Sequence, residues 1–215
     1  MHYFLVLWPG GTPKEDNMLK LLLASNNPGK LREILALLGD LPLELVTPLQ
    51  AGLSLEVAED GSTYAENAAR KALAFARSGN MLTLADDSGL EVEALHGEPG
   101  LHSARYLPNP GATDADRRAY LLLKLNGLPR PWQACFRCTV ALADPSGGIQ
   151  FAEGACPGEI IPEERGHDGF GYDPIFLLPD LGRTMAELTM NEKNRLSHRA
   201  RAILAARPLL MQWLH

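Results

Sequence analysis

The sequence is poor in cysteine. Three of the 215 residues are cysteines, a number too small, and odd, for a disulfide framework. Cys135 and Cys138 have the C-x-x-C spacing of redox and zinc motifs, but they lie in the segment 132–143, which we predict to be a strand. Residues three apart on a strand point to opposite faces, so neither role is expected. A reducing, cytoplasmic compartment is therefore the expected location.

Basic residues and long apolar runs are also scarce. The chain has 20 Lys and Arg residues against 26 Asp and Glu residues, and its formal net charge is −6. A phosphate backbone needs a basic surface, so a nucleic acid polymer is not an expected partner; a single nucleotide needs only a local basic cluster or a metal ion. No apolar run reaches the roughly 20 residues that span a bilayer, so a membrane partner is not expected either.

The composition is that of a protein with a substantial core. Hydrophobic residues make up 46% of the chain and charged residues 21%, which is typical of one folded domain of this length. The apolar run 4–8 lacks the preceding basic residues and the following small-residue site of a signal peptide. Because Met18 directly precedes a predicted strand, we expect residues 1–17 to be an N-terminal extension outside the fold and residues 18–215 to form a single domain.

Hydrophobic periodicity and turn residues predict alternating strands and helices. The predicted strands span 19–25, 43–46, 82–85, 90–95, 132–143, 149–155 and 174–178, with a short extended piece at 158–162. The predicted helices span 30–38, 63–78, 113–125 and 189–210. Ser197 is expected to interrupt the last of these as a fresh N-cap. Helices alternate with strands early and a hairpin follows later, which predicts an α/β protein with a mixed sheet, divided into two lobes around a cleft.

The stretch 82–89 brings two carboxylates to the end of a predicted strand. Its apolar run stops at Asp86 and Asp87, and Ser88 and Gly89 follow. Ligands in open α/β sheets collect outside the carboxyl ends of strands, and a divalent cation would offset the repulsion between adjacent acids. Mg²⁺ prefers one or two carboxylates together with substrate phosphate. The alternative is an ordinary acidic turn, since Asp, Ser and Gly are common turn residues.

The segment 25–30, Ser-Asn-Asn-Pro-Gly-Lys, lies between a predicted strand and a predicted helix. A helix N-terminus offers free N–H groups and a positive dipole to a phosphate. Gly29 permits close approach of the backbone, and Lys30 adds a point charge. The pattern is not a Walker A loop. A polar turn that merely caps the helix explains the same residues, and the segment alone leaves the two interpretations open.

The segment 166–174 carries three glycines, two aromatics and two acids in nine residues. An aromatic side chain in such a loop can stack on a nucleotide base. Phe170 and Tyr172 could instead fill the edge of the core, as aromatics often do.

The basic segment 193–199 follows a capping box, Thr189 to Glu192. If Ser197 begins a new helix, His198 and Arg199 lie at its start, near polar ligand atoms. A solvated basic face is the alternative.

Taken together and in order, these stretches resemble the inosine/xanthosine triphosphate pyrophosphatase family, which hydrolyses non-standard purine nucleotides. The resemblance runs from Met18 to about Leu210. It rests on Ser-x-Asn-x-Gly-Lys at 25–30, Glu-Asn-Ala at 66–68, Ala-Asp-Asp-Ser-Gly-Leu at 85–90, Pro-Gly-Leu-His-Ser-Ala-Arg-Tyr at 99–106, Phe-Gly-Tyr-Asp-Pro-Ile-Phe at 170–176, Ala-Glu-Leu-Thr at 186–189 and Lys-x4-Ser-His-Arg at 193–199. Residues 1–17 have no counterpart.

The resemblance implies an elongated mixed sheet with flanking helices and a central cleft, usually in a homodimer. It also implies Mg²⁺-dependent cleavage of a purine nucleoside triphosphate between its α and β phosphates, which gives the monophosphate and pyrophosphate. Asp87 would bind the metal and act as general base. Glu59 is the first choice for the second metal carboxylate, with Glu56 and Asp60 as alternatives.

The remaining implied roles concern the substrate. The phosphates would be held by Ser25, Asn26, Asn27, Pro28, Gly29, Lys30 and Lys193, and Ser88 would contact substrate next to the metal. The base would lie against Phe170, Gly171 and Tyr172 and face Asp173, His198 and Arg199.

Two other classes of protein compete with this interpretation. An aspartyl-phosphate phosphatase would have Asp-x-Asp, whereas Asp86 and Asp87 are adjacent. A nucleotide-binding regulator without catalysis would keep the 25–30 loop and lose the carboxylates, which this chain retains.

Overall fold

The computed structural model describes residues 18–214, which form one mixed α/β structure. The expected extension, residues 1–17, lies outside the described residues. The strands are β1 Leu19–Leu23, β2 Leu43–Val46, β3 Leu82–Val92, β4 Pro99–Gly100, β5 Trp132–Ala143, β6 Ile149–Ile160, β7 Phe176–Leu178 and β8 Arg183–Thr184. The α-helices are α1 Pro28–Leu38, α2 Tyr64–Gly79, α3 Asp114–Leu125, α4 Met190–Leu196 and α5 His198–Met211.

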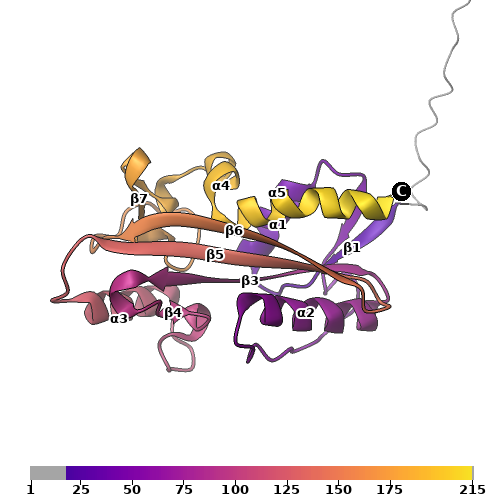
Figure 1. The fold of residues 1–215 in the computed structure, drawn as a ribbon, viewed down its shortest axis with the longest axis horizontal. Helices are drawn as coiled ribbons and strands as arrows, with labels where there is room; N and C mark the ends of the chain where they lie inside the picture. Colours follow the sequence, from indigo (N-terminus) through magenta and orange to yellow (C-terminus); the bar gives the residue numbers. More distant parts are fainter. Residues whose placement is uncertain (1–17, 215) are drawn as a thin grey trace, which may run out of the picture.

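The strands form a single eight-stranded sheet in the order β2-β1-β3-β5-β6-β7-β8, with β4 paired to β3. The β1 strand pairs in parallel with β2 and β3, while every other described pairing is antiparallel. The long strands β3, β5 and β6 run along the molecule and give it an elongated shape (Figure 1). The predicted α/β class and elongated mixed sheet are confirmed; the division into two lobes around a cleft stays a prediction.

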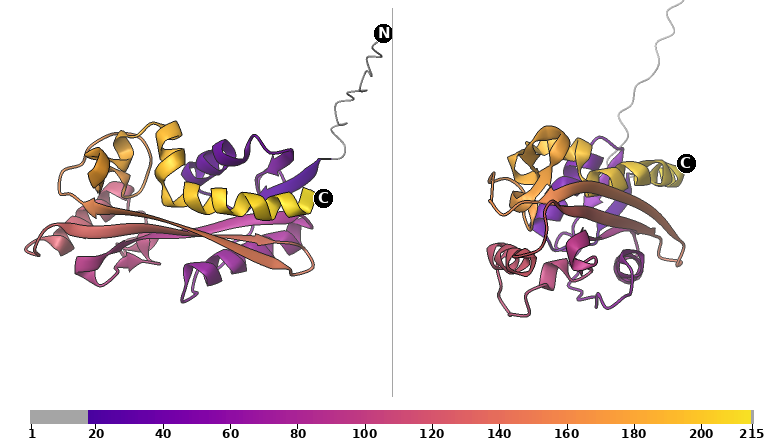
Figure 2. Two further views of the ribbon diagram at one scale, coloured as in Figure 1. Left: turned by 45° about the horizontal axis from the view of Figure 1, so that its top comes forward. Right: turned by 60° about the vertical axis from the view of Figure 1, so that its left-hand side comes forward.

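Helices cover both faces of this sheet (Figures 1 and 2). At one end, α1 and α5 pack on one face over a core that includes Leu21, Ile34 and Ile203, and α2 packs on the opposite face. At the other end, α3 and the β7 region cover the far halves of β3 and β5, around Leu121 and Phe176. None of the described helices is long and apolar enough to cross a membrane.

The prediction that the acidic stretch ends a strand was wrong. Residues 82–85 and 90–95 were expected to be two antiparallel strands, but β3 continues from Leu82 through Asp86 and Asp87 to Val92. The reason is pairing: β5 lies beside β3 along its whole length, from Thr83 opposite Ala143 to Val92 opposite Ala134. Only the parallel neighbour β1 stops, its last partner on β3 being Leu84. The two acids therefore follow the end of the parallel pairing.

Smaller differences have similar causes. The piece expected at 158–162 is the end of β6, because β6 stays paired with β5 as far as Ile160. Helix α1 starts at Pro28, two residues before its predicted start, because Pro28 takes the first helical position behind the Asn27 cap. The short strand β8 follows β7, which was expected to be the last strand.

The predicted break between the last two helices is confirmed. Ser197 ends α4 and caps α5, its hydroxyl accepting a hydrogen bond from the Ala200 N–H at 3.2 Å. Helix α4 begins with the expected capping box between Thr189 and Glu192. This break turns the chain so that the first turn of α5 lies against β6, where a Cβ on Gly154 would stand 2.2 Å from the His198 carbonyl oxygen.

Replacing Gly154 with alanine tests this close approach. The added methyl group would meet the α5 backbone, which cannot rotate aside, so we expect overpacking that costs about 1–3 kcal/mol. The melting temperature should fall by about 2–4 °C per kcal/mol for a chain of this size, as measured by calorimetry. Glu153→Ala, at the exposed neighbouring position on the same strand, should change it little. Equal melting temperatures for the two variants would contradict the packing argument.

Candidate active site

A cavity of about 170 Å³ lies on the sheet where β1 ends. Twelve residues predicted to bind substrate or metal line it: Asn27, Lys30, Glu59, Asp87, Ser88, Phe170, Gly171, Tyr172, Asp173, Lys193, His198 and Arg199. A neighbouring cavity of about 490 Å³ adds Ser25 and Asn26. Gly29 lines a third cavity of about 260 Å³ behind Phe170, and Pro28 is the first residue of α1. The tertiary structure therefore gathers residues that are up to 174 positions apart in the sequence, from Ser25 to Arg199.

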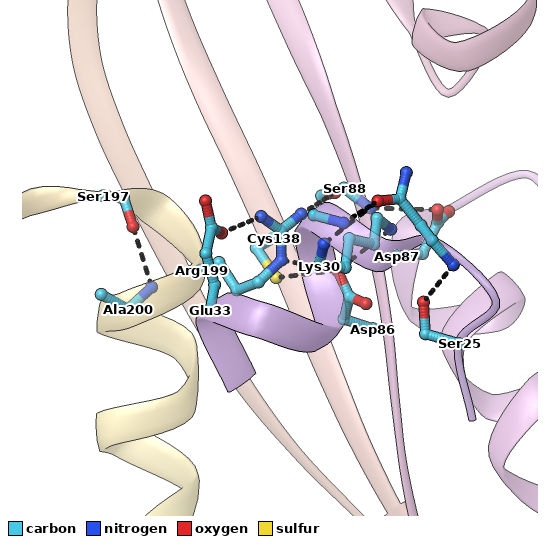
Figure 3. Close-up of polar contacts among 12 residues, drawn as sticks. Ser25, Lys30, Glu33, Asp86, Asp87, Ser88, Cys138, Ser197, Arg199 and Ala200 are labelled. Atoms are coloured by element: carbon cyan, nitrogen blue, oxygen red, sulfur yellow. Dashed lines mark hydrogen bonds and ion pairs between the residues drawn. The ribbon is translucent and has the colours of Figure 1, made fainter. Parts of the chain in front are cut away.

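The 25–30 segment is ordered by its own side chains. Asn27 caps α1, and its Oδ1 accepts hydrogen bonds from the N–H groups of Gly29 at 2.8 Å and Lys30 at 3.1 Å. Ser25 Oγ accepts from the Asn27 N–H at 3.2 Å (Figure 3). Two N–H groups at this helix start thus already have a partner. What the segment presents to an anion is the positive end of α1 and the Lys30 ammonium group.

The adjacent acids have different surroundings because neighbouring side chains on a strand point to opposite faces. Asp86 is 1% exposed and pairs with Lys30 Nζ at 3.1 Å and Arg199 Nε at 3.1 Å. Burial alone would raise the pKa of Asp86, but the charges of Lys30, Arg199 and Lys71 outweigh it and hold the pKa far below its usual range. Asp86 is therefore an ionised anchor for cations, and its Oδ1 has no hydrogen-bond partner among residues 18–214.

Asp87 faces the cavity and the α2 side of the sheet. Its Oδ2 accepts a hydrogen bond from Asn67 Nδ2 at 3.0 Å. Burial raises the pKa of Asp87, and the negative charge of Glu59 adds to the increase. Asn67 lies in the Glu-Asn-Ala stretch, but no role was predicted for it from the sequence. In the structure it is buried on α2, and its hydrogen bond orients the Asp87 carboxylate.

Of the three acids considered for the second metal position, Glu59 is the one that shares both main cavities with Lys30. Glu56 lines only the larger cavity, and Asp60 is exposed and paired with Arg70. Lys71 Nζ contacts Glu59 Oε1 at 2.6 Å and the Asp86 carbonyl oxygen at 2.6 Å. Lys71 was not predicted from the sequence, because one lysine in an alanine-rich helix resembles an ordinary solvated residue.

A buried ionic network closes the other end of the cavity. Lys193 Nζ lies 2.7 Å from Glu33 Oε1 and 2.6 Å from Asp173 Oδ2. Arg199 Nη1 lies 2.5 Å from Glu33 Oε2, and its Nη2 donates to Ser88 Oγ at 2.9 Å. Figure 3 shows Arg199 reaching from α5 between Glu33 and the β3 acids. Since three of its five N–H groups bond to protein atoms, two remain for a ligand.

Glu33, like Asn67 and Lys71, was not among the residues predicted from the sequence to belong to the site. A signal existed: Glu33 lies four residues from both Gly29 and Leu37, so helical spacing places it on the buried face of α1. A carboxylate on that face needs buried cations as partners, and Lys193 and Arg199 supply them.

The segment 166–174, here called the aromatic loop, presents one of its two rings to the cavity and buries the other. The Phe170 ring is partly exposed, with Lys193 Nζ at 5.0 Å and Arg199 Cζ at 5.5 Å from its centroid. Tyr172 is buried, and its hydroxyl donates to the Ser103 carbonyl oxygen at 2.9 Å. Asp173 Oδ2 accepts from the Phe170 N–H at 2.9 Å. Phe170 thus has the better geometry for stacking on a flat ligand.

His198 is buried in the same wall of the cavity. Its ring stacks on Phe136 with centroids 4.7 Å apart and an interplanar angle of 14°. Burial lowers the pKa of His198 well below its usual value, and the charge of Arg199 lowers it further. A neutral imidazole is therefore present at neutral pH, and its Nδ1 has no hydrogen-bond partner in the described part of the chain. The cavity as a whole suits a flat polar ring joined to an anion.

Removal of the Glu33 charge tests the network. Glu33→Gln leaves Lys193 and Arg199 buried with less compensation, so we expect a loss of about 3–5 kcal/mol in unfolding free energy. Burial raises the pKa of Glu33, but Arg199 and Lys193 bring it below 4.5. This lowered pKa makes the carboxylate stabilising above pH 4.5, and its contribution is lost as the pH falls through the folded-state pKa.

The measurement is urea unfolding as a function of pH. The wild-type protein should lose stability at acid pH more steeply than Glu33→Gln does. Glu44→Gln, which removes the exposed partner of Lys20, is the control and should behave like the wild type. Wild-type stability in Glu33→Gln at neutral pH would be inconsistent with the network.

Comparisons with known proteins identify the family of this chain. The model of the Ham1 family matches residues 21–209. A dITP/XTP pyrophosphatase of Desulforamulus reducens is 47% identical over 193 residues, which cover 89% of this chain and 96% of that protein. A dITP/XTP pyrophosphatase of Geobacillus kaustophilus is 46% identical over 187 residues, or 86% of this chain and 91% of that protein.

Solved structures give the same result. A HAM1 protein from Coxiella burnetii superimposes with a TM-score of 0.82 at 39% identity, covering 91% of this chain and 100% of that one. The Ham1 protein of Staphylococcus aureus gives a TM-score of 0.79 at 37% identity, covering 90% and 99%. The predicted family resemblance is confirmed: this chain belongs to the Ham1 family.

Proposed function

We propose that this protein hydrolyses non-standard purine nucleoside triphosphates, those of inosine, deoxyinosine and xanthosine, to the monophosphate and pyrophosphate. The observation that carries the proposal is that one cavity holds the Asp87 carboxylate, the Lys30 ammonium group and the Phe170 ring. The carboxylate can accept a proton from the attacking water, the ammonium group can bind phosphate, and the aromatic ring can stack on a purine. The names of the curated relatives, dITP/XTP pyrophosphatase, support the same reaction.

A divalent cation, Mg²⁺ in our proposal, fits the residues present. Burial raises the pKa of Asp87, and the nearby negative charge of Glu59 adds a smaller increase, so a cation would be favourable between these two carboxylates. Among residues 18–214, no group of three or more His, Cys, Asp or Glu side chains could hold a metal. A pair of carboxylates with substrate phosphate is the donor set that Mg²⁺ prefers. When bound, the cation would neutralise phosphate charge and make water more acidic.

The protein's own groups then have distinct roles. Asp87, oriented by Asn67, accepts the proton of the attacking water. Lys30 and the positive end of α1 bind the phosphates, with Lys71 beside them in the larger cavity. Ser88 bonds to Arg199 and lies next to Asp87, at the side of the reacting phosphate.

At the other end of the cavity, Phe170 stacks on the purine. Lys193 was expected to hold phosphate; because its Nζ lies 5.0 Å from the centroid of the Phe170 ring, our proposal places it at the base end of the nucleotide instead. His198 and the two unused N–H groups of Arg199 face the edge of the base, with Gly171, Tyr172 and Asp173 completing the wall. We also propose that the protein acts in the cytoplasm, as a homodimer, on free nucleotides.

The catalytic assignment is tested by Asp87→Asn. The amide can still accept the Asn67 hydrogen bond but can neither accept a proton nor bind a cation well. Turnover should therefore fall at least by the roughly 10²–10⁴-fold typical of general base catalysis, with the melting temperature retained.

The assay is pyrophosphate release from inosine triphosphate with and without added Mg²⁺. Asp144→Asn, in the β5–β6 turn, is the control and should keep full activity. More than a tenth of wild-type turnover in Asp87→Asn would exclude Asp87 as the base. Absence of any Mg²⁺-dependent release by the wild-type protein would favour a nucleotide-binding regulator.

Selectivity provides a second test. Arg199 can only donate hydrogen bonds, so its free N–H groups match the 6-oxo group of inosine and xanthosine and oppose the 6-amino group of adenosine. Sites that leave a buried donor unpaired can reject an analogue by about 10⁴-fold. We expect kcat/KM for inosine triphosphate to exceed that for adenosine triphosphate by far more than tenfold at fixed Mg²⁺. A ratio below ten would show that the Arg199 donors do not distinguish the substituents at position 6 of the purine.

A further inference from the structure

The backbone of Gly171, next to the stacking ring of Phe170, is held by two hydrogen bonds from helix α3. Its N–H donates to Asp114 Oδ2 at 2.7 Å, and its carbonyl oxygen accepts from Arg118 Nη1 at 2.9 Å. Both partners lie in the first turns of α3, a helix whose start is fixed by a capping box between Thr113 and Asp116. A helix distant in the sequence thus holds the two peptide groups on either side of the Gly171 Cα atom.

Arg118 is itself held in place. Its Nε and Nη2 bond to the two carboxylate oxygens of Glu164 at 2.8 and 2.9 Å, an arrangement that fixes the plane of the guanidinium group. The Arg118 side chain is only 12% exposed, although Glu164 is 46% exposed. Hydrogen bonds from Arg118 lower the pKa of Glu164, so the pair stays ionised at neutral pH. Arg118, on α3, therefore bonds both to Glu164, which precedes the aromatic loop, and to Gly171 within that loop.

Side-chain packing does not fix the backbone at Gly171. The residue has a φ of +62°, and a Cβ placed there would meet no atom within 4 Å, so side-chain packing does not hold this point. Gly166 and Gly169 in the same loop also have positive φ. Glycines leave a chain with more conformational freedom than other residues. Within the loop, Phe170 and Asp173 bond to each other twice: the Asp173 N–H donates to the Phe170 carbonyl oxygen at 3.2 Å, and Asp173 Oδ2 accepts from the Phe170 N–H at 2.9 Å. The described hydrogen bonds to Gly171 itself both come from α3.

We propose that Arg118 is a positioning residue for nucleotide binding: by holding the Gly171 carbonyl group, it keeps the Phe170 ring in the orientation that stacks on the base. Arg118 is absent from the lining of the active-site cavity, whereas Phe170, Gly171 and Asp114 line it. Its effect on substrate therefore passes through Gly171. Preorganising a binding group raises affinity because less freedom is lost when the ligand binds. The inference rests on the proposed function.

The first experiment compares Arg118→Ala and Arg118→Lys with the wild-type protein. For inosine triphosphate we expect KM to rise about three- to tenfold and kcat to stay within about twofold, because binding is weakened and the reacting groups are untouched. Inorganic tripolyphosphate, a competitor without a base, should keep its inhibition constant. Lysine keeps the charge but not the planar fork, so Arg118→Lys should show part of the same increase in KM.

Arg207→Ala is the matched control. Arg207 also bonds to both oxygens of one carboxylate, Asp40, at 2.7 and 2.6 Å, and to a backbone carbonyl group, that of Leu37, at 2.8 Å. It joins α5 to the end of α1, away from the aromatic loop. Its loss should leave KM for inosine triphosphate unchanged. An equal rise in KM for the two alanine variants would mean that losing any such arginine weakens binding, and would overturn the inference.

A double-mutant cycle with Phe170→Ala tests whether Arg118 affects KM through the Phe170 ring. If Arg118 acts through the ring, Arg118→Ala should add almost nothing to the KM of the Phe170→Ala protein. Additive increases, or a weaker inhibition by tripolyphosphate, would refute the positioning role.

The failure of the proposed function and the failure of this inference give different results. Wild-type protein that releases no pyrophosphate would refute the proposed function. An active wild type with unchanged KM in both Arg118 variants would refute this inference alone. Circular dichroism confirms that each variant is folded.

Discussion

The site depends on the ion pairs that Arg199 makes inside the protein. Its guanidinium group joins Asp86 on β3 to Glu33 on α1, and Glu33 joins Lys193 on α4. These charges lie where the sheet, the two C-terminal helices and α1 meet. Removing one charge leaves others buried without a partner, which costs more than the pair contributes when intact. The network therefore fixes the relative placement of these elements more than it adds to overall stability.

The same network separates the roles of the two adjacent acids. Asp86 points toward Lys30 and Arg199, which keep it ionised, and Asp87 points toward the cavity, where burial and Glu59 raise its pKa. A continuous strand makes this division possible, because successive side chains alternate between its faces. One acid organises the cations and the other remains available for chemistry. A turn at this point would have exposed both carboxylates to water and given them similar surroundings.

The two ends of the cavity are held by different means. At the phosphate end, Asn27 caps α1 and the short segment orders itself. At the base end, a glycine-rich loop depends on partners elsewhere: Lys193 bonds to Asp173 of the loop, and Asp114 and Arg118 of α3 bond to Gly171. A loop of this kind can bring a ring close to a ligand, but it needs outside contacts to stay in one conformation. This explains why so many charged residues surround Phe170.

Local sequence determined the features that depend on neighbouring residues. Ser197 as a cap, the bounds of β5 and the C-x-x-C pair on a strand follow from spacing and turn chemistry, which act over a few residues. The motifs also identified most of the residues that line the cavity. Only the tertiary structure decided that β3 runs straight through the acids, because its pairing with β5 comes from residues about fifty positions away. It likewise decided that Glu33 and Lys71 belong to the site, since a charged side chain on a helix reveals its buried partners only when distant segments pack around it.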